Sequence, residues 1–170
     1  MSDPKDLEFL AAKSKEMVEK QVDSFRSKQS NAGTIIGVTA LFIPFFLTGL
    51  ENAYPLIEYL SIIPVLLFIC SMVIMLWVLR TKLLYQFFHV KKYKELVNKD
   101  YTEILLFEIG ANNDSYTDNK PLNDRLTKRF NFGITITTIA IIISVGLLLA
   151  NKFYKPETPP TKVQIITSTK

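Results

Sequence analysis

The sequence predicts an all-α integral membrane protein with three membrane-spanning helices, an N-terminal amphipathic helix, and a cytoplasmic helical region between the second and third spans. Hydrophobic residues make up 48% of the 170 residues although 21% are charged, so the two classes must be segregated. No charged residue occurs in residues 29–50, 59–79 or 130–151. Crossing a bilayer takes about 20 apolar residues in a helix. A soluble bundle of three core helices is disfavoured, because a small chain could not cover helices that are apolar on every face.

Residues 1–28 are predicted to form a cytoplasmic amphipathic helix. They carry six acidic and six basic residues and lack the apolar core and cleavage site of a signal peptide. Asp3 can cap this helix, and Pro4 suits its first position. The apolar residues recur at helical spacing: Leu7, Leu10, Ala11, Met17, Val18, Val22 and Phe25. A helix that lies on lipid normally carries an excess of Lys and Arg, so packing against protein is favoured over lipid binding.

Residues 29–79 are predicted to form a transmembrane hairpin, with spans at about 30–50 and 59–79. The first span contains a GxxxG motif, Gly33 and Gly37, with Ala40 on the same side. Small residues of this kind let two membrane helices approach closely. Pro44 and Pro64 lie at similar depth in the hairpin and are predicted to kink it. The alternative is that neighbouring helices simply tolerate both prolines.

Residues 130–151 are predicted to form the third span, and residues 152–170 a disordered extracytoplasmic tail. Small residues recur along one face of the span at spacings of four, three and four: Gly133, Thr137, Ala140 and Ser144. The face can serve tight helix packing, with hydroxyls bonded to backbone carbonyls, or it can line a pore or subunit interface. No Asp, Glu, Lys, Arg or His lies within any span, which argues against a proton-coupled transporter, a metal carrier or an intramembrane hydrolase.

Residues 80–129 are predicted to form the cytoplasmic helical region. The second span is expected to continue as a long amphipathic helix up to a polar, turn-rich stretch at 110–121, after which Pro121 starts a helix that runs into the third span. The apolar face of the long helix consists of Leu83, Phe87, Val90, Val97, Tyr101 and Ile104. We expect this face to pack with the N-terminal helix or with copies of itself, and to receive a signal from a cytoplasmic partner protein.

The distribution of positive charge predicts the orientation. Residues 1–28 and 80–129 together contain sixteen Lys and Arg, residues 51–58 contain none, and residues 152–170 contain four. The positive-inside rule then places the N-terminus and residues 80–129 in the cytoplasm and the C-terminus outside a bacterial inner membrane. Basic residues next to the spans are predicted to meet anionic lipid headgroups: Arg80, Lys82, Lys91, Lys92 and Lys94. Nucleic-acid binding is disfavoured, because residues 80–129 carry seven acids beside ten bases.

The sequence contains few groups suited to catalysis or metal binding. Cys70 and His89 are the single cysteine and histidine, so neither an intramolecular disulfide nor a zinc site can be built from them. No Gly-rich phosphate loop and no nucleophile–base arrangement is present. We therefore expect no enzyme activity, no cofactor and no metal.

The stretch "DSFRSKQSNAGTIIGVTALFIPFFL" resembles the start of small bacterial membrane effectors of nucleotide-signalled anti-phage systems, the SLATT-type two-span modules. The resemblance rests on the junction formed by Ser27, Lys28, Ala32 and Gly33. It covers the first half of the chain, and a third span and the lack of a recognisable sensor domain depart from it. It implies a homo-oligomeric effector that forms or gates a pore on a cytoplasmic signal. The alternative is a membrane anchor or adaptor that docks a soluble partner without conducting ions.

Overall fold

The computed structural model describes residues 4–81, 84 and 94–154. This part of the chain contains three long helices and no strand: α1 (Pro4–Gly49), α2 (Pro55–Leu79) and α4 (Tyr101–Tyr154), with a short helical turn at residues 94–96. Each long helix contains a stretch long and apolar enough to cross a membrane. The prediction of an all-α chain with three candidate membrane spans is confirmed.

A tight turn joins α1 to α2. Asn52 adopts a positive φ of 61°, a conformation that asparagine tolerates better than most residues. Tyr54 is extended, with a ψ of 137°, as expected for a residue that precedes proline. Pro55 then takes the first turn of α2, where its missing N–H costs nothing. The turn therefore folds α2 back along the second half of α1.

The prediction that α2 continues into the cytoplasm as a long helix is wrong. The helix ends at Leu79, and Arg80 is its C-terminal cap residue. The amide of Thr81 bonds the carbonyl of Val78, three residues back, which tightens and closes the last turn. The side-chain amide of Gln29, from α1, also reaches the carbonyls of this turn. Helix α2 therefore ends where a neighbouring helix satisfies its carbonyl oxygens.

The predicted polar turn at residues 110–121 is also wrong, because α4 runs through it without a break. Pro121 lies inside this helix rather than starting a new one. Asn112 and Asn119 are buried, so their side chains take part in packing instead of turning the chain. Asn, Asp, Ser and Thr disfavour a helix by less than about 1 kcal/mol each. Packing along α1 overrides that preference.

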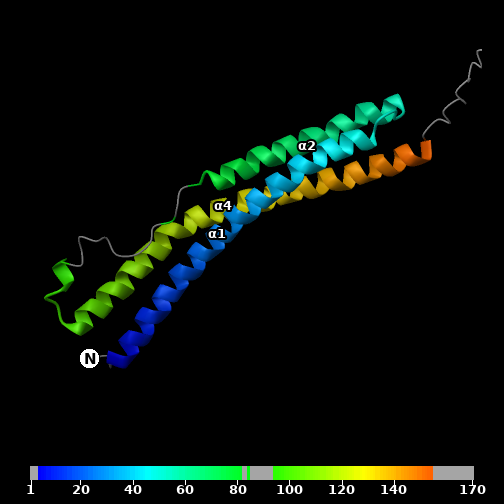
Figure 1. Ribbon diagram of the computed structural model, residues 1–170. Helices are drawn as coiled ribbons and strands as arrows, with labels where there is room; N and C mark the ends of the chain where they lie inside the picture. Colours follow the sequence, from blue (N-terminus) through cyan, green and yellow to red (C-terminus); the bar gives the residue numbers. More distant parts are fainter. Residues whose placement is uncertain (1–3, 82–83, 85–93, 155–170) are drawn as a thin grey trace, which may run out of the picture.

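The three helices form a bundle at one end and a pair at the other (Figure 1). Helices α1 and α4 run parallel: Leu7 clusters with Leu105 near their starts, and Asn151 bonds the carbonyl of Gly49 near their ends. Helix α2 lies antiparallel beside their second halves. We call residues 4–28 of α1 and 101–129 of α4 the polar halves, and the uncharged remainders the apolar halves.

Buried residues recur every seven positions along all three helices. In α1 they are Ala11, Val18, Phe25, Ala32, Thr39 and Phe46. In α2 they are Ile57, Pro64, Ser71 and Val78, interleaved with Ser61, Phe68 and Met75. In α4 they are Leu105, Asn112, Asn119, Leu126, Gly133 and Ala140. This heptad spacing is that of helices that coil around one another with a left-handed twist, and in α1 and α4 it passes unbroken from the polar into the apolar half.

Candidate functional site: the groove between the polar halves of α1 and α4

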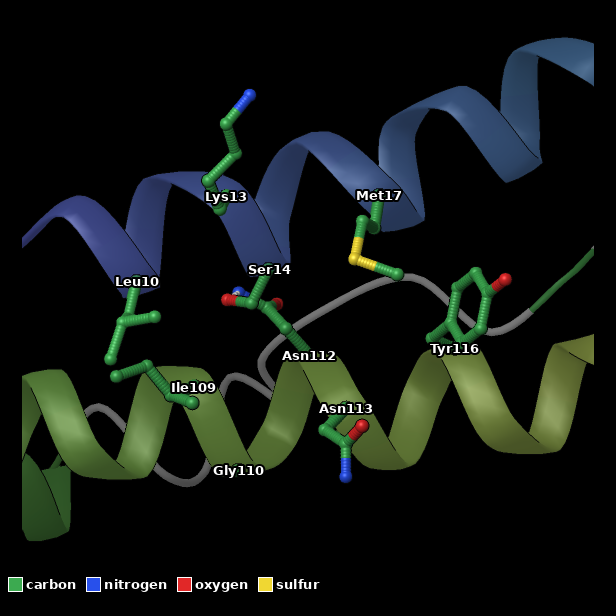
Figure 2. Close-up of a pocket in the computed structure, with 9 residues that line it drawn as sticks. All are labelled: Leu10, Lys13, Ser14, Met17, Ile109, Gly110, Asn112, Asn113 and Tyr116. Atoms are coloured by element: carbon green, nitrogen blue, oxygen red, sulfur yellow. Dashed lines mark hydrogen bonds between the residues drawn. The ribbon is translucent and has the colours of Figure 1, made fainter.

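A cavity of about 310 Å³ lies between the polar halves of α1 and α4 (Figure 2). Helix α1 contributes Leu10, Lys13, Ser14 and Met17, and α4 contributes Ile109, Gly110, Asn112, Asn113 and Tyr116. A second cavity of about 310 Å³ adjoins it and shares Met17 and Tyr116; its other lining residues are Lys20, Gln21, Lys120, Asn123 and Asp124. We call the two together the α1–α4 groove.

The groove is built over a buried, partly unsatisfied asparagine. The Asn112 side chain is 1% exposed, and its amide nitrogen donates to the Ser14 hydroxyl oxygen over 2.9 Å. That hydroxyl in turn donates to the carbonyl of Ala11 over 2.8 Å. The Asn112 Oδ1 atom is buried and has no hydrogen-bond partner among the described residues. Leaving such an acceptor unpaired costs about 1–3 kcal/mol, so this layer of the helix pair is not optimised for stability.

Gln21 repeats the pattern one heptad along α1 from Ser14. Its amide nitrogen donates to the carbonyl oxygen of Tyr116 over 3.3 Å, whereas its buried Oε1 atom has no partner among the described residues. The groove thus contains two unpaired amide oxygens beneath its surface. Native interiors leave few such groups unpaired, and each calls for an explanation.

The rim of the groove is charged. Glu16 lies between two lysines, with its carboxylate 2.6 Å from the Lys13 ammonium and 2.7 Å from that of Lys20. The hydrogen bond from Lys13, followed by that from Lys20, lowers the pKa of Glu16 from 4.5 to about 2. At the end of the pair, a hydrogen bond from the Tyr101 hydroxyl to the Glu8 carboxylate, over 2.8 Å, raises the pKa of Tyr101.

Apolar side chains are exposed beside this rim. Of the apolar residues predicted along the N-terminal helix, Leu7, Ala11, Val18, Val22 and Phe25 are buried. Leu10 and Met17 are not, and each remains 50% exposed at the groove. They lie seven residues apart, so they follow the same heptad spacing as the buried seam. That spacing would suit contact with another helix lying along the groove.

The predicted signal-receiving face is only partly within the described residues. Leu83, Phe87 and Val90 lie outside them. Val97 is 78% exposed, Tyr101 is exposed, and Ile104 is half-buried, so these three do not form one packed face. Of the predicted lipid-contacting basic residues, Arg80 and Lys94 are exposed, whereas Lys82, Lys91 and Lys92 lie outside the described residues.

The small-residue stripe of α4 faces inward. Gly133 lies against Met75 of α2, where an added Cβ atom would come within 2.6 Å of the Met75 methyl carbon. The Ser71 hydroxyl donates to the carbonyl oxygen of Gly133 over 3.0 Å and is also paired with the Thr137 hydroxyl. Ala140 and Ser144 are buried as well. In this structure the stripe packs mainly against α2, with Gly133, Ala140 and Ser144 buried and Thr137 half-buried.

The small-residue stripe of α1, in contrast, lies on the outer surface of the three helices. A Cβ atom added at Gly33 or Gly37 would meet nothing within 4 Å, and Ala40 is exposed. Of the two prolines in the hairpin, Pro44 is exposed on α1 and Pro64 is buried in α2. The inward face of α1 is formed by Ala32, Thr39 and Phe46 instead. The GxxxG face therefore remains open to whatever surrounds the three helices.

Sequence reasoning missed the polar residues of the seam: Gln21, Gln29, Asn112 and Asn119. A signal was present, because Asn112 and Asn119 stand fourteen and seven residues before Leu126, in phase with Gly133 and Ala140. Among the described residues, no group of three or more His, Cys, Asp or Glu side chains could hold a metal ion.

Comparisons of the chain with protein families, curated proteins and solved structures find no match.

Proposed function

We propose that this protein is a homo-oligomeric membrane effector whose α1–α4 groove receives a signal and whose apolar helices respond by forming or gating a pore. The observation that carries the proposal is the heptad seam of α1 and α4, which runs unbroken from the groove into the apolar halves. Two helices that share one continuous seam move together, so a rotation or displacement at one end reaches the other.

The half-satisfied seam supports the groove as the receiving end. Asn112 and Gln21 each leave a buried oxygen unpaired, and Leu10 and Met17 leave apolar surface exposed next to them. A partner protein that covered the apolar side chains and repacked the seam would favour a different arrangement of the pair. The sixteen Lys and Arg residues of segments 1–28 and 80–129 favour a cytoplasmic groove and a bacterial inner-membrane location.

The open face of α1 supports self-assembly. The uncharged half of α1 presents a smooth surface at Gly33, Gly37 and Ala40, and no other described helix covers it. In lipid, close approach of small residues is a principal source of helix–helix affinity. We assign this face to the contact between copies of the chain. The role in anti-phage defence rests on the resemblance of the first half of the chain to membrane effectors of such systems.

An artificial trigger tests this function without knowledge of the natural one. The full chain, carrying a drug-inducible dimerisation domain fused at its N-terminus, is reconstituted into liposomes loaded with a fluorescent dye. We expect dye release only after the dimerising drug is added, and less release for Gly37→Leu than for the control Val38→Leu, which alters an exposed residue next to it. Retention of dye at every protein density, with and without the drug, would reject a pore.

A second candidate function is a membrane anchor that docks a soluble partner at the groove. The half-exposed Leu10 and Met17, outside the uncharged stretches, favour it specifically. An anchor would bind its partner through these residues, so Met17→Glu would abolish binding. The liposomes of the first experiment would keep their dye in every condition, which separates the two functions.

A further inference from the structure

A cation–π contact links α2 and α4 where both helices leave the uncharged stretches. The guanidinium carbon of Arg129 lies 5.9 Å from the centre of the Trp77 ring. Trp77 is 58% exposed, and Arg129 is exposed as well. A guanidinium that stacks on an aromatic face keeps its N–H groups, which lie in its own plane, free to meet another ligand.

Arg80 adds a second guanidinium on the same side of α2. It follows Trp77 by three residues at the end of the helix, and residues at that spacing lie on one face. Arg80 is exposed, and no ion pair joins Arg80 or Arg129 to an acidic side chain of the described residues. Two arginines that form no ion pair within the described part of the chain therefore lie beside one exposed indole.

The depth of this arrangement matches the surface of a membrane. Arg80 is the first charged residue after the uncharged residues 59–79, and Arg129 is the last one before residues 130–151. Both lie beside the start of the uncharged part of α1, because Gln29 bonds the end of α2. Tryptophan concentrates at the level of lipid headgroups. The phosphates of phospholipids occupy the same level.

We propose that Arg80, Trp77 and Arg129 form a binding site for the phosphate of an anionic phospholipid. The two guanidinium groups would donate hydrogen bonds to the phosphate oxygens, and arginine suits this role because its N–H groups match two oxygens at once. The indole holds Arg129 in place and lies against the upper part of the lipid chains. This inference is independent of pore formation, since an anchor at the same depth would use the same site.

Native mass spectrometry of the full chain tests the site. The detergent-solubilised protein is mixed with equal amounts of phosphatidylglycerol and phosphatidylcholine. After the detergent is removed in the spectrometer, the protein should retain phosphatidylglycerol in preference to phosphatidylcholine. Each basic residue near an anionic membrane surface contributes about a fivefold gain in affinity, so Arg80→Gln and Arg129→Gln should each lose retention about fivefold. Lys128→Gln is the matched control, because it removes one charge at the same depth from an exposed position on another side of α4.

Arg129→Lys keeps the charge but loses the planar group, and it should fall between the wild type and Arg129→Gln. Thermal unfolding identifies a variant that fails to fold. If Arg129→Gln fails to fold, Arg129→Lys takes its place in the comparison with Lys128→Gln. Equal losses for Lys128→Gln and Arg129→Gln would overturn the site, because the preference would then be a general effect of charge.

The fluorescence of Trp77, the single tryptophan of the chain, distinguishes the source of the phosphate. Titration of the detergent-solubilised protein with phosphatidylglycerol should change the emission of Trp77, and titration with inorganic phosphate at the same concentrations should not. An equal response to inorganic phosphate would overturn the assignment to lipid.

Discussion

The side-chain amide nitrogen of Gln29 lies 3.1 Å from the carbonyl oxygen of Thr81 and 3.4 Å from that of Val78, so a residue in the middle of α1 caps the end of α2. The last carbonyls of a helix have no partner within the helix. Without such a partner they would take water or the amides of a further turn. The Gln29 contact therefore fixes both the length of α2 and its depth relative to α1.

We predict that Gln29→Leu loosens the end of α2. Each hydrogen bond contributes about 0.5–1.5 kcal/mol, and the substitution removes two or more, so the free energy of unfolding should fall by about 1–2 kcal/mol. Hydrogen exchange should accelerate at the amides of Arg80 and Thr81, which close the last turn. Ser30→Ala, at the exposed next residue, is the control and should change neither quantity. Unchanged protection of both amides in Gln29→Leu would show that Gln29 does not act as the cap.

A matched pair of glycine substitutions separates folding from assembly. Gly133 lies against Met75, whereas Gly37 faces open space. Both changes to leucine favour helix formation by a similar amount, so their difference reports packing. We predict that Gly133→Leu lowers the free energy of unfolding by about 1–3 kcal/mol, because it overfills the contact with α2. Gly37→Leu should leave that energy unchanged and weaken self-association in lipid.

Thermal unfolding in detergent measures the first effect, and energy transfer between labelled copies in liposomes measures the second. A loss of stability in Gly37→Leu equal to that in Gly133→Leu would show that this face of α1 is covered within one chain. Unchanged energy transfer in Gly37→Leu would reject the face as the contact between copies.

The low pKa of Glu16 gives a prediction about acid. Its pKa is lowered from 4.5 to about 2, so the two lysine contacts contribute stability above pH 4.5 and lose that contribution as the pH falls toward 2. The two lysine side chains are exposed and that of Glu16 is partly exposed, so salt should screen the effect. Titration of the Glu16 carboxyl by NMR should give a pKa that rises toward 4.5 in 1 M NaCl, and also in Lys13→Gln. Titration near 4.5 at low salt in the wild type would contradict the arrangement.

The sequence was sufficient to predict the three candidate spans, because stretches without charge and long enough for a bilayer can be seen directly. The end of α2 could not be predicted, since its cap comes from Gln29, about 50 positions away in the chain. The local preferences of residues 110–121 predict a turn, because these preferences do not include the contact that this segment makes with α1 in the folded chain. Asn112 is accommodated in a helix here because the Ser14 hydroxyl of α1 accepts a hydrogen bond from its side-chain amide nitrogen.

The small-residue stripes show the same limit. The spacing of Gly33 and Gly37, or of Gly133 and Thr137, indicates that another helix can come close. It does not indicate which helix. In the structure the α4 stripe packs against Ser71 and Met75 of α2, whereas no described helix packs against the α1 stripe. Which helix each stripe contacts depends on the relative rotation of the three helices, and the whole heptad seam sets that rotation.

The seam itself yields the last prediction. Asn112 has a buried oxygen without a partner, and its nitrogen bonds a hydroxyl that already donates to Ala11. Replacing a half-satisfied buried polar group with an apolar one of similar size is often neutral or stabilising. We predict that Asn112→Leu raises the free energy of unfolding by about 1–2 kcal/mol, measured by thermal unfolding in detergent, whereas the exposed Asn113→Leu changes it by less than about 0.5 kcal/mol.

The stabilised helix pair in Asn112→Leu should also resist rearrangement, so the drug-triggered release of dye should fall in Asn112→Leu and not in Asn113→Leu. Lower stability in Asn112→Leu would show instead that the Asn112 oxygen has a partner in the assembled protein, and that the groove is a completed contact.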